Sequence, residues 1–154
     1  MRVAIGTDHA GFALKERLKR ELEALGHQVV DVGTYSEAPA VDYPDFCFPV
    51  AEKVARGEAD RGVVLGGSGI GEAIAANKVA GVRAAVVTSD ETARLSRQHN
   101  DANVLALGGR TNALDDAARW LRIWLETPFE GGRHVPRLRK IADYENARHA
   151  TRSR

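Results

Sequence analysis

Short apolar runs alternate with helical patterns along the chain, and this alternation is the feature that most restricts the possible fold. Five runs have the composition of buried strands: residues 3–6, 28–32, 62–65, 82–87 and 104–107. Their apolar residues follow one another without polar alternation, as in strands that are covered on both faces. Helical segments separate the runs. The pattern predicts an α/β fold: a Rossmann-like three-layer αβα sandwich around a five-stranded parallel sheet.

The expected helices lie between the strands and after the last one. Leucine spacing and helix-stop residues predict helices over residues 12–25, 46–55, 71–79, 91–99 and 114–125. A basic tail follows Pro128. Pro136 fits the first turn of a last helix, with Leu138 and Ile141 on its inner side. We find no linker or internal repeat, so we expect one domain over residues 1–154, with a C-terminal helical tail from about residue 129 able to reach outside it.

Composition excludes several classes of partner. The chain has 154 residues and a net charge of +1, which suits one core and gives no support for nucleic-acid binding. Its one cysteine, Cys47, excludes an internal disulfide and a multi-cysteine metal site. The first apolar stretch is too short for a signal peptide or a membrane span. We therefore expect a cytoplasmic protein without nucleic-acid or membrane partners.

Polar residues follow the ends of the predicted strands. In open α/β sheets, ligands bind beyond the carboxyl ends of the strands. That rule selects the following positions: Asp8, His9, Asp42, Tyr43, residues 66–72, Ser89, Asp90, Gly108, Gly109 and Arg110.

The glycine-rich segment Gly66-Gly67-Ser68-Gly69-Ile70-Gly71-Glu72 is the strongest local feature. Its glycines allow a tight turn, and the helix start that follows offers free N–H groups to a phosphate or an oxyanion. The alternative is a strand-to-helix turn that only packs. The segment lacks the lysine of a P-loop and the last glycine of a hydrolase G-x-S-x-G motif. A dinucleotide fingerprint fits poorly too, because the turn follows the third strand.

Several other residues keep two interpretations. Glu72 is either a reactive acid or a favourable charge at a helix start. Asp8 is either a ligand residue or a helix N-cap, and His99 is either a site residue or the end of a helix. The arginines of the tail are either a phosphate clamp or a solvated basic face. As a clamp, the tail is expected to fold back over the strand ends with Glu72. Cys47 is expected to be a core thiol.

Six segments, in order along the chain, resemble the ribose-5-phosphate isomerase B family, within its wider group with galactose-6-phosphate isomerase subunits. They are Gly6-Thr7-Asp8-His9-Ala10-Gly11-Phe12, Asp42-Tyr43-Pro44-Asp45, Gly66-Gly67-Ser68-Gly69-Ile70-Gly71, Ala75-Ala76-Asn77-Lys78, Ser96-Arg97-Gln98-His99-Asn100-Asp101 and Gly131-Gly132-Arg133-His134. The resemblance covers the chain to about Tyr144.

The resemblance implies a homodimer, sometimes paired into a tetramer, with the active site at the subunit interface. It implies neither a metal nor a cofactor. Some members carry a catalytic cysteine directly after the third strand, where this chain has Gly66. The other branch uses a glutamate after the glycine turn, and Glu72 matches it.

The implied reaction is the interconversion of ribose 5-phosphate and ribulose 5-phosphate through a cis-enediolate. Glu72 would be the base, His99 with Asp8 would open the sugar ring, and Ser68 would assist the turn. The residues implied to bind substrate are His9, Tyr43, Gly67, Gly69, Ile70, Gly71, Asn100, Arg110, Arg133, His134 and Arg137. Of these site residues, His99, Asn100 and Arg110 are expected to come from the neighbouring subunit.

Two alternatives stay open. One is an isomerase of another aldose phosphate, such as a tetrose 4-phosphate or galactose 6-phosphate. The other is a non-catalytic nucleotide- or flavin-binding module, which the same architecture allows.

Overall fold

The computed structural model describes all residues from 1 to 154 and contains one parallel sheet. Its strands are β1 (Arg2–Thr7), β2 (Gln28–Asp31), β3 (Arg61–Gly66), β4 (Ala84–Val86) and β5 (Val104–Gly108). They lie in the order β2-β1-β3-β5-β4, and every neighbouring pair is parallel. The predicted five-stranded parallel sheet is confirmed.

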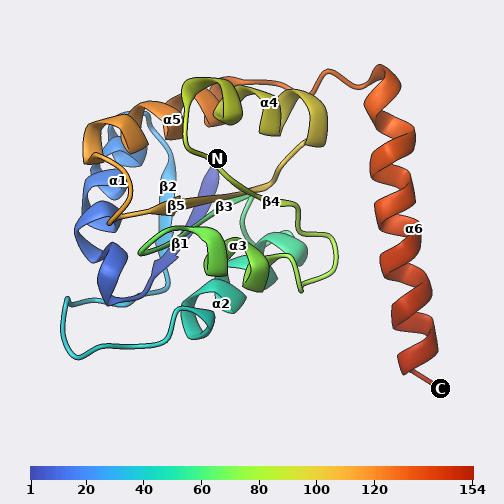
Figure 1. Ribbon diagram of the computed structural model, residues 1–154, viewed down its shortest axis with the longest axis horizontal. Helices are drawn as coiled ribbons and strands as arrows, with labels where there is room; N and C mark the ends of the chain where they lie inside the picture. The colour runs from blue at the N-terminus through green and yellow to red at the C-terminus, as the bar shows by residue number, and fades with distance from the viewer.

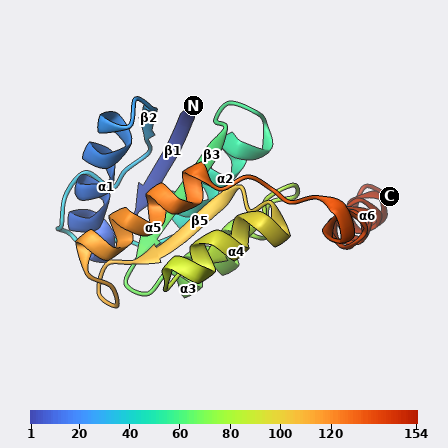
Figure 2. The ribbon, with the colours of Figure 1, turned by 90° about the horizontal axis from the view of Figure 1, so that it is seen from above.

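Helices cover both faces of the sheet (Figures 1 and 2). Helices α1 (Phe12–Ala24), α4 (Asp90–Asn100) and α5 (Leu114–Glu126) pack on one face, and α2 (Pro44–Ala55) and α3 (Ile70–Ala76) pack on the other. Two short 3-10 helices, η1 (His9–Gly11) and η2 (Gly132–His134), precede α1 and the last helix, α6 (Val135–Arg152). The three-layer sandwich predicted from the sequence is therefore present.

The strands supply alternate side chains to two buried clusters. In β1, Val3 and Ile5 join the cluster under α1, α4 and α5, whereas Ala4 joins the cluster under α2 and α3. The same alternation holds in β5, where Leu105 and Ala106 point to opposite faces. Because both faces are buried, strands of this kind need apolar residues at every position, which accounts for the continuous runs in the sequence.

The edge strand β4 is shorter than the predicted run over residues 82–87. Asn77, at the end of α3, satisfies both backbone groups of Ala84. The Ala84 N–H donates to Asn77 Oδ1 at 2.8 Å, and Asn77 Nδ2 donates to the Ala84 carbonyl at 2.9 Å. An edge strand otherwise leaves such groups unpaired. The asparagine side chain therefore takes the place of a neighbouring strand at this position.

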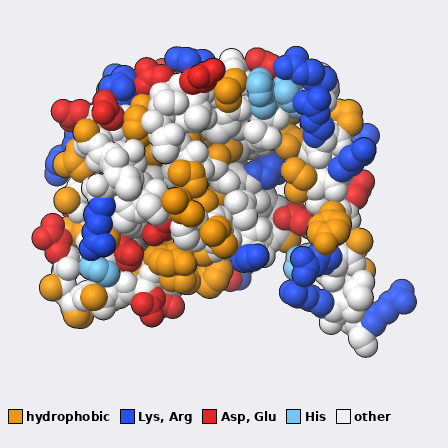
Figure 3. All heavy atoms as spheres, in the orientation of Figure 1, with side chains coloured by type: hydrophobic (Ala, Val, Ile, Leu, Met, Phe, Trp, Pro, Cys, Tyr) orange, Lys and Arg blue, Asp and Glu red, His pale blue; other side chains and the backbone are white.

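Helix α6 stands away from the sandwich (Figure 1). The expected inner side packs little against this chain: no residue of α6 is buried, Leu138 is half-buried and Ile141 is 49% exposed. An open groove of about 590 Å³ separates the helix from the loop around Lys78, and Figure 3 shows it between the tail and the body. Glu145 is one of the few links across it and accepts a hydrogen bond from the Gly81 N–H at 3.1 Å. No helix is both long enough and apolar enough to cross a membrane.

The core of the sheet predicts a large cost for truncating Leu105, which is fully buried in the centre of β5. Leu105→Ala should lower the free energy of unfolding by about 2–5 kcal/mol, because it removes apolar contacts and leaves a cavity. Leu114→Ala is the matched control, since Leu114 is 39% exposed and should lose far less. Urea unfolding at one fixed protein concentration measures both. Equal losses for the two variants would contradict this assignment of the core.

Candidate active site

Open α/β sheets hold their ligand crevice where the helices that follow two neighbouring strands lie on opposite faces. Strands β1 and β3 are neighbours, yet α1 follows β1 on one face and α3 follows β3 on the other. The segments that leave the two strands therefore diverge, which makes this the ligand-binding position of open α/β sheets. The predicted segments from Asp8 and from Gly66 meet here.

The glycine turn between β3 and α3 is tightly packed against β5. Gly69 has a φ of 81°, in the left-handed region, and a Cβ there would lie 3.0 Å from the backbone of Leu107. A side chain is thus excluded by both conformation and space. The Ser68 hydroxyl accepts a hydrogen bond from the Ile70 N–H at 3.2 Å and shapes the turn. A Cβ on Gly71 would lie 2.7 Å from Cζ of Tyr43, so the tyrosine ring covers this part of the turn.

Glu72 lies buried under the turn, with only 4% of its surface exposed. Its Oε2 atom has no hydrogen-bond partner, although a buried carboxylate normally has one. Burial raises the pKa of this carboxyl, and the negative charge of Asp8 raises it further; backbone groups of Glu72 and Gly69 act in the opposite direction. An unpartnered acid with a raised pKa at a ligand crevice has the properties of a general base or acid.

The glutamate occupies the space that a side chain at position 66 would need. A Cβ on Gly66 would lie 1.7 Å from Oε1 of Glu72. Any larger residue at position 66 would therefore displace the carboxylate from its present place. Gly66 and Glu72 are therefore sterically coupled: the absence of a side chain at the end of β3 leaves space for the carboxylate from α3.

Asp8 and His9 follow β1 and shape the other side of the crevice. Asp8 Oδ1 accepts hydrogen bonds from the N–H groups of Ala10 and Gly11, at 2.9 and 3.3 Å. Asp8 is therefore the N-cap of η1, which was one of its two interpretations from the sequence. His9 Nδ1 accepts from the Val41 N–H at 3.1 Å. This bond ties the segment before Tyr43 to the crevice.

Arg110 and Cys47 also lie close to this group. Arg110 extends over the glycine turn of its own chain: a Cβ on Gly67 would lie 3.6 Å from Arg110 Cδ.

Cys47 is a fully buried core thiol, as expected. Burial raises the pKa of Cys47 to about 12, and the charges of Glu72 and Asp8 contribute. Such a thiol is protonated at neutral pH and is a weak nucleophile.

The remaining predicted residues gather around the end of α4. The rings of His99 and His134 stack with their centroids 4.3 Å apart and their planes at 19°. Arg137 Nη1 lies 3.4 Å from Nδ1 of His134, and the Glu130 N–H donates to the Gln98 carbonyl at 3.1 Å. The start of the tail therefore packs on the end of α4, where histidine side chains gather in Figure 3.

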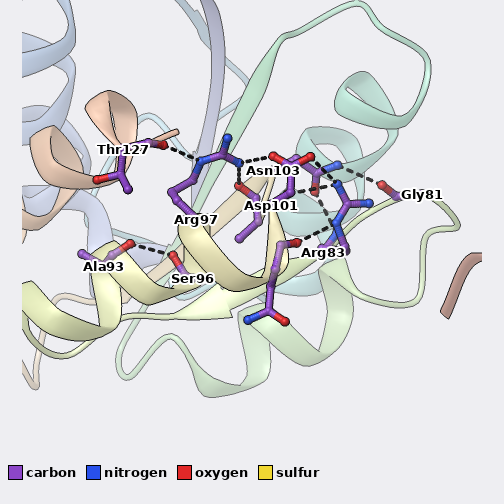
Figure 4. Close-up of polar contacts among 10 residues, drawn as sticks. Gly81, Arg83, Ala93, Ser96, Arg97, Asp101, Asn103 and Thr127 are labelled. Carbon is purple, nitrogen blue, oxygen red and sulfur yellow. Dashed lines mark hydrogen bonds and ion pairs between the residues drawn. The ribbon is translucent and has the colours of Figure 1, made fainter. Parts of the chain in front are cut away.

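Two arginines hold the end of α4 in place (Figure 4). Arg97 donates to the carbonyls of Thr127 and Ala102 at 3.2 and 2.6 Å, and pairs with Asp101 at 2.8 Å. Arg83 Nε donates to the carbonyl of Asn100 at 2.9 Å. Helix C-termini otherwise leave such carbonyls unsatisfied. The contacts fix the backbone that carries His99 and Asn100.

The predicted site residues thus form two groups, which lie at opposite ends of the strands. The first group lies beyond the carboxyl ends of β1 and β3 and contains Asp8, His9, Tyr43, residues 67–72 and Arg110. The second group lies where α4 ends and the chain enters the amino end of β5, and it contains His99, Asn100, Arg133, His134 and Arg137. One chain does not bring the two groups together.

One cluster offers ligand atoms that a metal ion could use. His99, Glu130 and His134 have donor atoms within 4.8 Å of one another. However, the two rings are nearly parallel, so their in-plane lone pairs do not converge on one point. The positive charges of Arg133 and Arg137 also act on His134, which disfavours a dication there.

Comparison with known proteins decides the family. Residues 3–141 match the model of the Ribose/Galactose Isomerase family. The chain belongs to this family. It is 45% identical to ribose-5-phosphate isomerase B of Escherichia coli, over 96% of this chain and 98% of that protein. A solved ribose-5-phosphate isomerase B of Clostridium thermocellum superposes with a TM-score of 0.93 at 50% identity, covering 96% and 99% of the two chains.

A second solved relative contains a bound sugar phosphate. It is ribose-5-phosphate isomerase B of Mycoplasma genitalium with bound ribulose-5-phosphate, at a TM-score of 0.90 and 42% identity, covering 94% of this chain and 96% of that one. The similarity extends over nearly the full length of both proteins, so it includes both groups of site residues.

The geometry corrects two expectations that came from the family resemblance and from the tail sequence. Arg110 was expected to serve a neighbouring subunit's site, but its side chain lies on Gly67 of its own chain. The tail was expected to fold back over the strand ends with Glu72. Instead, η2 and the start of α6 pack on the end of α4, with His99. The reason is that hydrogen bonds join Thr127 and Glu130 to α4, so the chain is already held there before it reaches Arg133.

Sequence reasoning missed two features of the site. Glu130, which faces His134 at 3.7 Å, was not singled out; its spacing of four residues from His134 was the available signal. The closeness of Cys47 to Glu72 had no local signal, since it arises from the packing of α2 against α3.

The raised pKa of Glu72 predicts how its substitution affects stability. Burial favours the protonated form of Glu72 in the folded protein. The free energy of unfolding therefore falls as the pH rises from 4.5, which is the ordinary pKa of the group, through the raised pKa. Glu72→Gln resembles the protonated form. Its melting temperature should equal that of wild type near about pH 4 and exceed it near about pH 8. Thermal unfolding at both pH values measures the difference, and a glutamine variant that is less stable at the higher pH would contradict the buried-charge argument.

Proposed function

We propose that the protein interconverts D-ribose 5-phosphate and D-ribulose 5-phosphate. The observation that carries the proposal is the buried Glu72 carboxylate, unpartnered at Oε2 and placed beneath a turn of backbone N–H groups. Aldose–ketose isomerisation needs one base that moves a proton between adjacent carbons and donors that stabilise a negative oxygen. Full-length relatives named ribose-5-phosphate isomerase B support the choice of substrate.

The proposed reaction begins with ring opening. His99, with Asp8, takes the proton from the C1 hydroxyl and delivers one to the ring oxygen while the bond between C1 and that oxygen breaks. Asp8 Oδ1 is occupied by backbone N–H groups, so the second carboxylate oxygen is the one available to the sugar. His9 and Tyr43 would hold sugar hydroxyls at the same crevice.

Proton transfer between the carbons follows. Glu72 removes the proton from C2 of the open aldose, and the electron pair moves into the C1 carbonyl to give a cis-enediolate. The N–H groups of residues 67–71, with the Ser68 hydroxyl, stabilise the negative oxygen, and each such donor contributes about 2.7–4 kcal/mol in comparable sites. The O2 proton moves to O1, and Glu72 returns its proton to C1. The product is the ketose, and the carboxylate is regenerated.

The site is completed by a second subunit in this proposal. Glu72 and His99 lie at opposite ends of the strands of one sheet, so a sugar can contact both only if two chains contribute. We infer a homodimer, with or without pairing into a tetramer, in which His99, Asn100, Arg133 and Arg137 of one chain face Glu72 and Arg110 of the other. The exposed inner side of α6 and the groove beside it support this arrangement. Residues 1–154 would then act as one isomerase domain, with the tail from about residue 129 at the dimer interface; a cytoplasmic location stays a prediction.

The phosphate group would lie at the far end of the sugar from Glu72. Arg133 and Arg137 would grip it with paired N–H donors, and Arg110 would approach from the other chain. Such an anchor leaves C1 and C2 at the glycine turn, which places the reacting atoms against their base. Comparing tetrose 4-phosphate, pentose 5-phosphate and hexose 6-phosphate substrates tests the chain length.

Glu72→Gln should fold and should lose nearly all isomerase activity, because the amide cannot accept the C2 proton. Cys47→Ala is the matched control: it changes a buried neighbour of Glu72 that has no role in proton transfer, and its kcat should stay close to that of wild type. A coupled assay for ribulose 5-phosphate measures both. A glutamine variant with more than about a tenth of wild-type kcat has lost under ~1.4 kcal/mol of barrier stabilisation, which is too little for the base.

Mixing two inactive proteins tests the shared site. His99→Ala and Glu72→Gln are each expected to be inactive as homodimers. A mixed dimer contains one site with both residues intact, so activity should return after subunit exchange, to at most about half of the wild-type value per mixed dimer. Native mass spectrometry verifies that exchange has occurred. Verified exchange without recovered activity would show that each chain supplies both residues to its own site.

A further inference from the structure

His134 is a buried histidine with a different neighbour on each side of its ring. It is only 3% exposed, and its ring stacks on His99. Nδ1 faces Arg137 Nη1 at 3.4 Å, whereas Nε2 faces Glu130 Oε2 at 3.7 Å and makes no hydrogen bond. The ring thus joins the proposed ring-opening residue to a proposed phosphate ligand.

The contact with Arg137 fixes the tautomer of His134. A guanidinium has only donors and keeps its charge in proteins, so Nδ1 must be the acceptor in this pair. The proton of a neutral imidazole then lies on Nε2, where it points toward the carboxylate of Glu130. A carboxylate in that position favours the same tautomer.

The surroundings of the ring disfavour its protonated form. Arg133 and Arg137 lie on the tail, His99 on α4, and Glu130 on the segment between α5 and η2. Loss of solvation lowers the pKa of His134, as do Arg133, His99 and Arg137; Glu130 alone among these raises it. A neutral ring among cations is a poor partner for a phosphate dianion, because it adds no positive charge.

We infer that His134 is a positioning residue, not a phosphate ligand: its neutral ring supports His99 by stacking and orients Arg137 through Nδ1, with Glu130 holding the proton on Nε2. This inference rests on the proposed function for the roles of His99 and Arg137. It links the two ends of the substrate, since one side chain sets the group that opens the sugar ring and the group that binds its phosphate.

Two variants separate the two tasks of the ring. His134→Phe keeps an aromatic ring against His99 but removes the acceptor for Arg137, whereas His134→Ala removes both. We expect both to raise the KM for ribose 5-phosphate, by about three- to tenfold, as the loss of one weak charged hydrogen bond suggests. His134→Ala should in addition lower kcat at least about fivefold more than His134→Phe does.

Deuterium exchange identifies the step that is lost. Ribulose 5-phosphate has no free hydroxyl at C5 and stays open-chain, so exchange of its C1 hydrogen with D2O needs Glu72 but no ring chemistry. In His134→Ala, this exchange should fall much less than the conversion of ribose 5-phosphate. Equal losses in exchange and conversion, or equal kcat values for the alanine and phenylalanine variants, would overturn the positioning role.

Nitrogen-15 NMR of the histidines tests the tautomer without any activity measurement. In the full chain at about pH 6 to 8, His134 should show an unprotonated Nδ1 and a protonated Nε2, and Glu130→Gln should increase the other tautomer. His149, exposed in the last turn of α6, gives a second histidine signal for comparison. A doubly protonated His134, or a proton on Nδ1, would overturn the inference. Absence of isomerase activity in the wild-type protein would instead refute the proposed function and leave this readout intact.

Discussion

The divergence of the chain between β1 and β3 is the constraint on which the rest of the site depends. A helix that leaves β1 on one face and a helix that leaves β3 on the other cannot fill the space between their starts. The glycine turn occupies one side of that space, and the cap formed by Asp8 occupies the other. The fold therefore supplies the crevice, and the residues at the strand ends supply its chemistry.

A buried carboxylate is the main electrostatic cost within this crevice. Glu72 lies under the turn with Asp8 close enough to raise its pKa, and Oε2 has no hydrogen bond to offset the loss of water. Gly66 leaves the room that the carboxylate fills. Destabilised acids of this kind are typical of reactive sites, because the same surroundings that disfavour the charge bring the pKa nearer to neutral.

Much of the fold, and the position of half of the candidate site, could be predicted from the sequence. Continuous apolar runs identify the strands, and the rule for strand ends selects Asp8, Glu72 and their neighbours. The second half could not be assembled this way. His99 contacts His134, and not Glu72, because α4 ends at the amino ends of the strands and because Arg97 is hydrogen-bonded to Thr127. No local sequence pattern encodes either of these features. Only the three-dimensional structure shows that most of the inner side of α6 stays exposed within one chain.

A crystal structure of the protein with bound ribose 5-phosphate tests the central claim most directly, which is that two chains complete one site. The account predicts that the carbons at one end of the sugar contact Glu72 of one chain, while the phosphate contacts Arg133 and Arg137 of another. A structure in which a single chain supplies Glu72 and both arginines to the same sugar, or in which the sugar lies away from the glycine turn, would contradict the account.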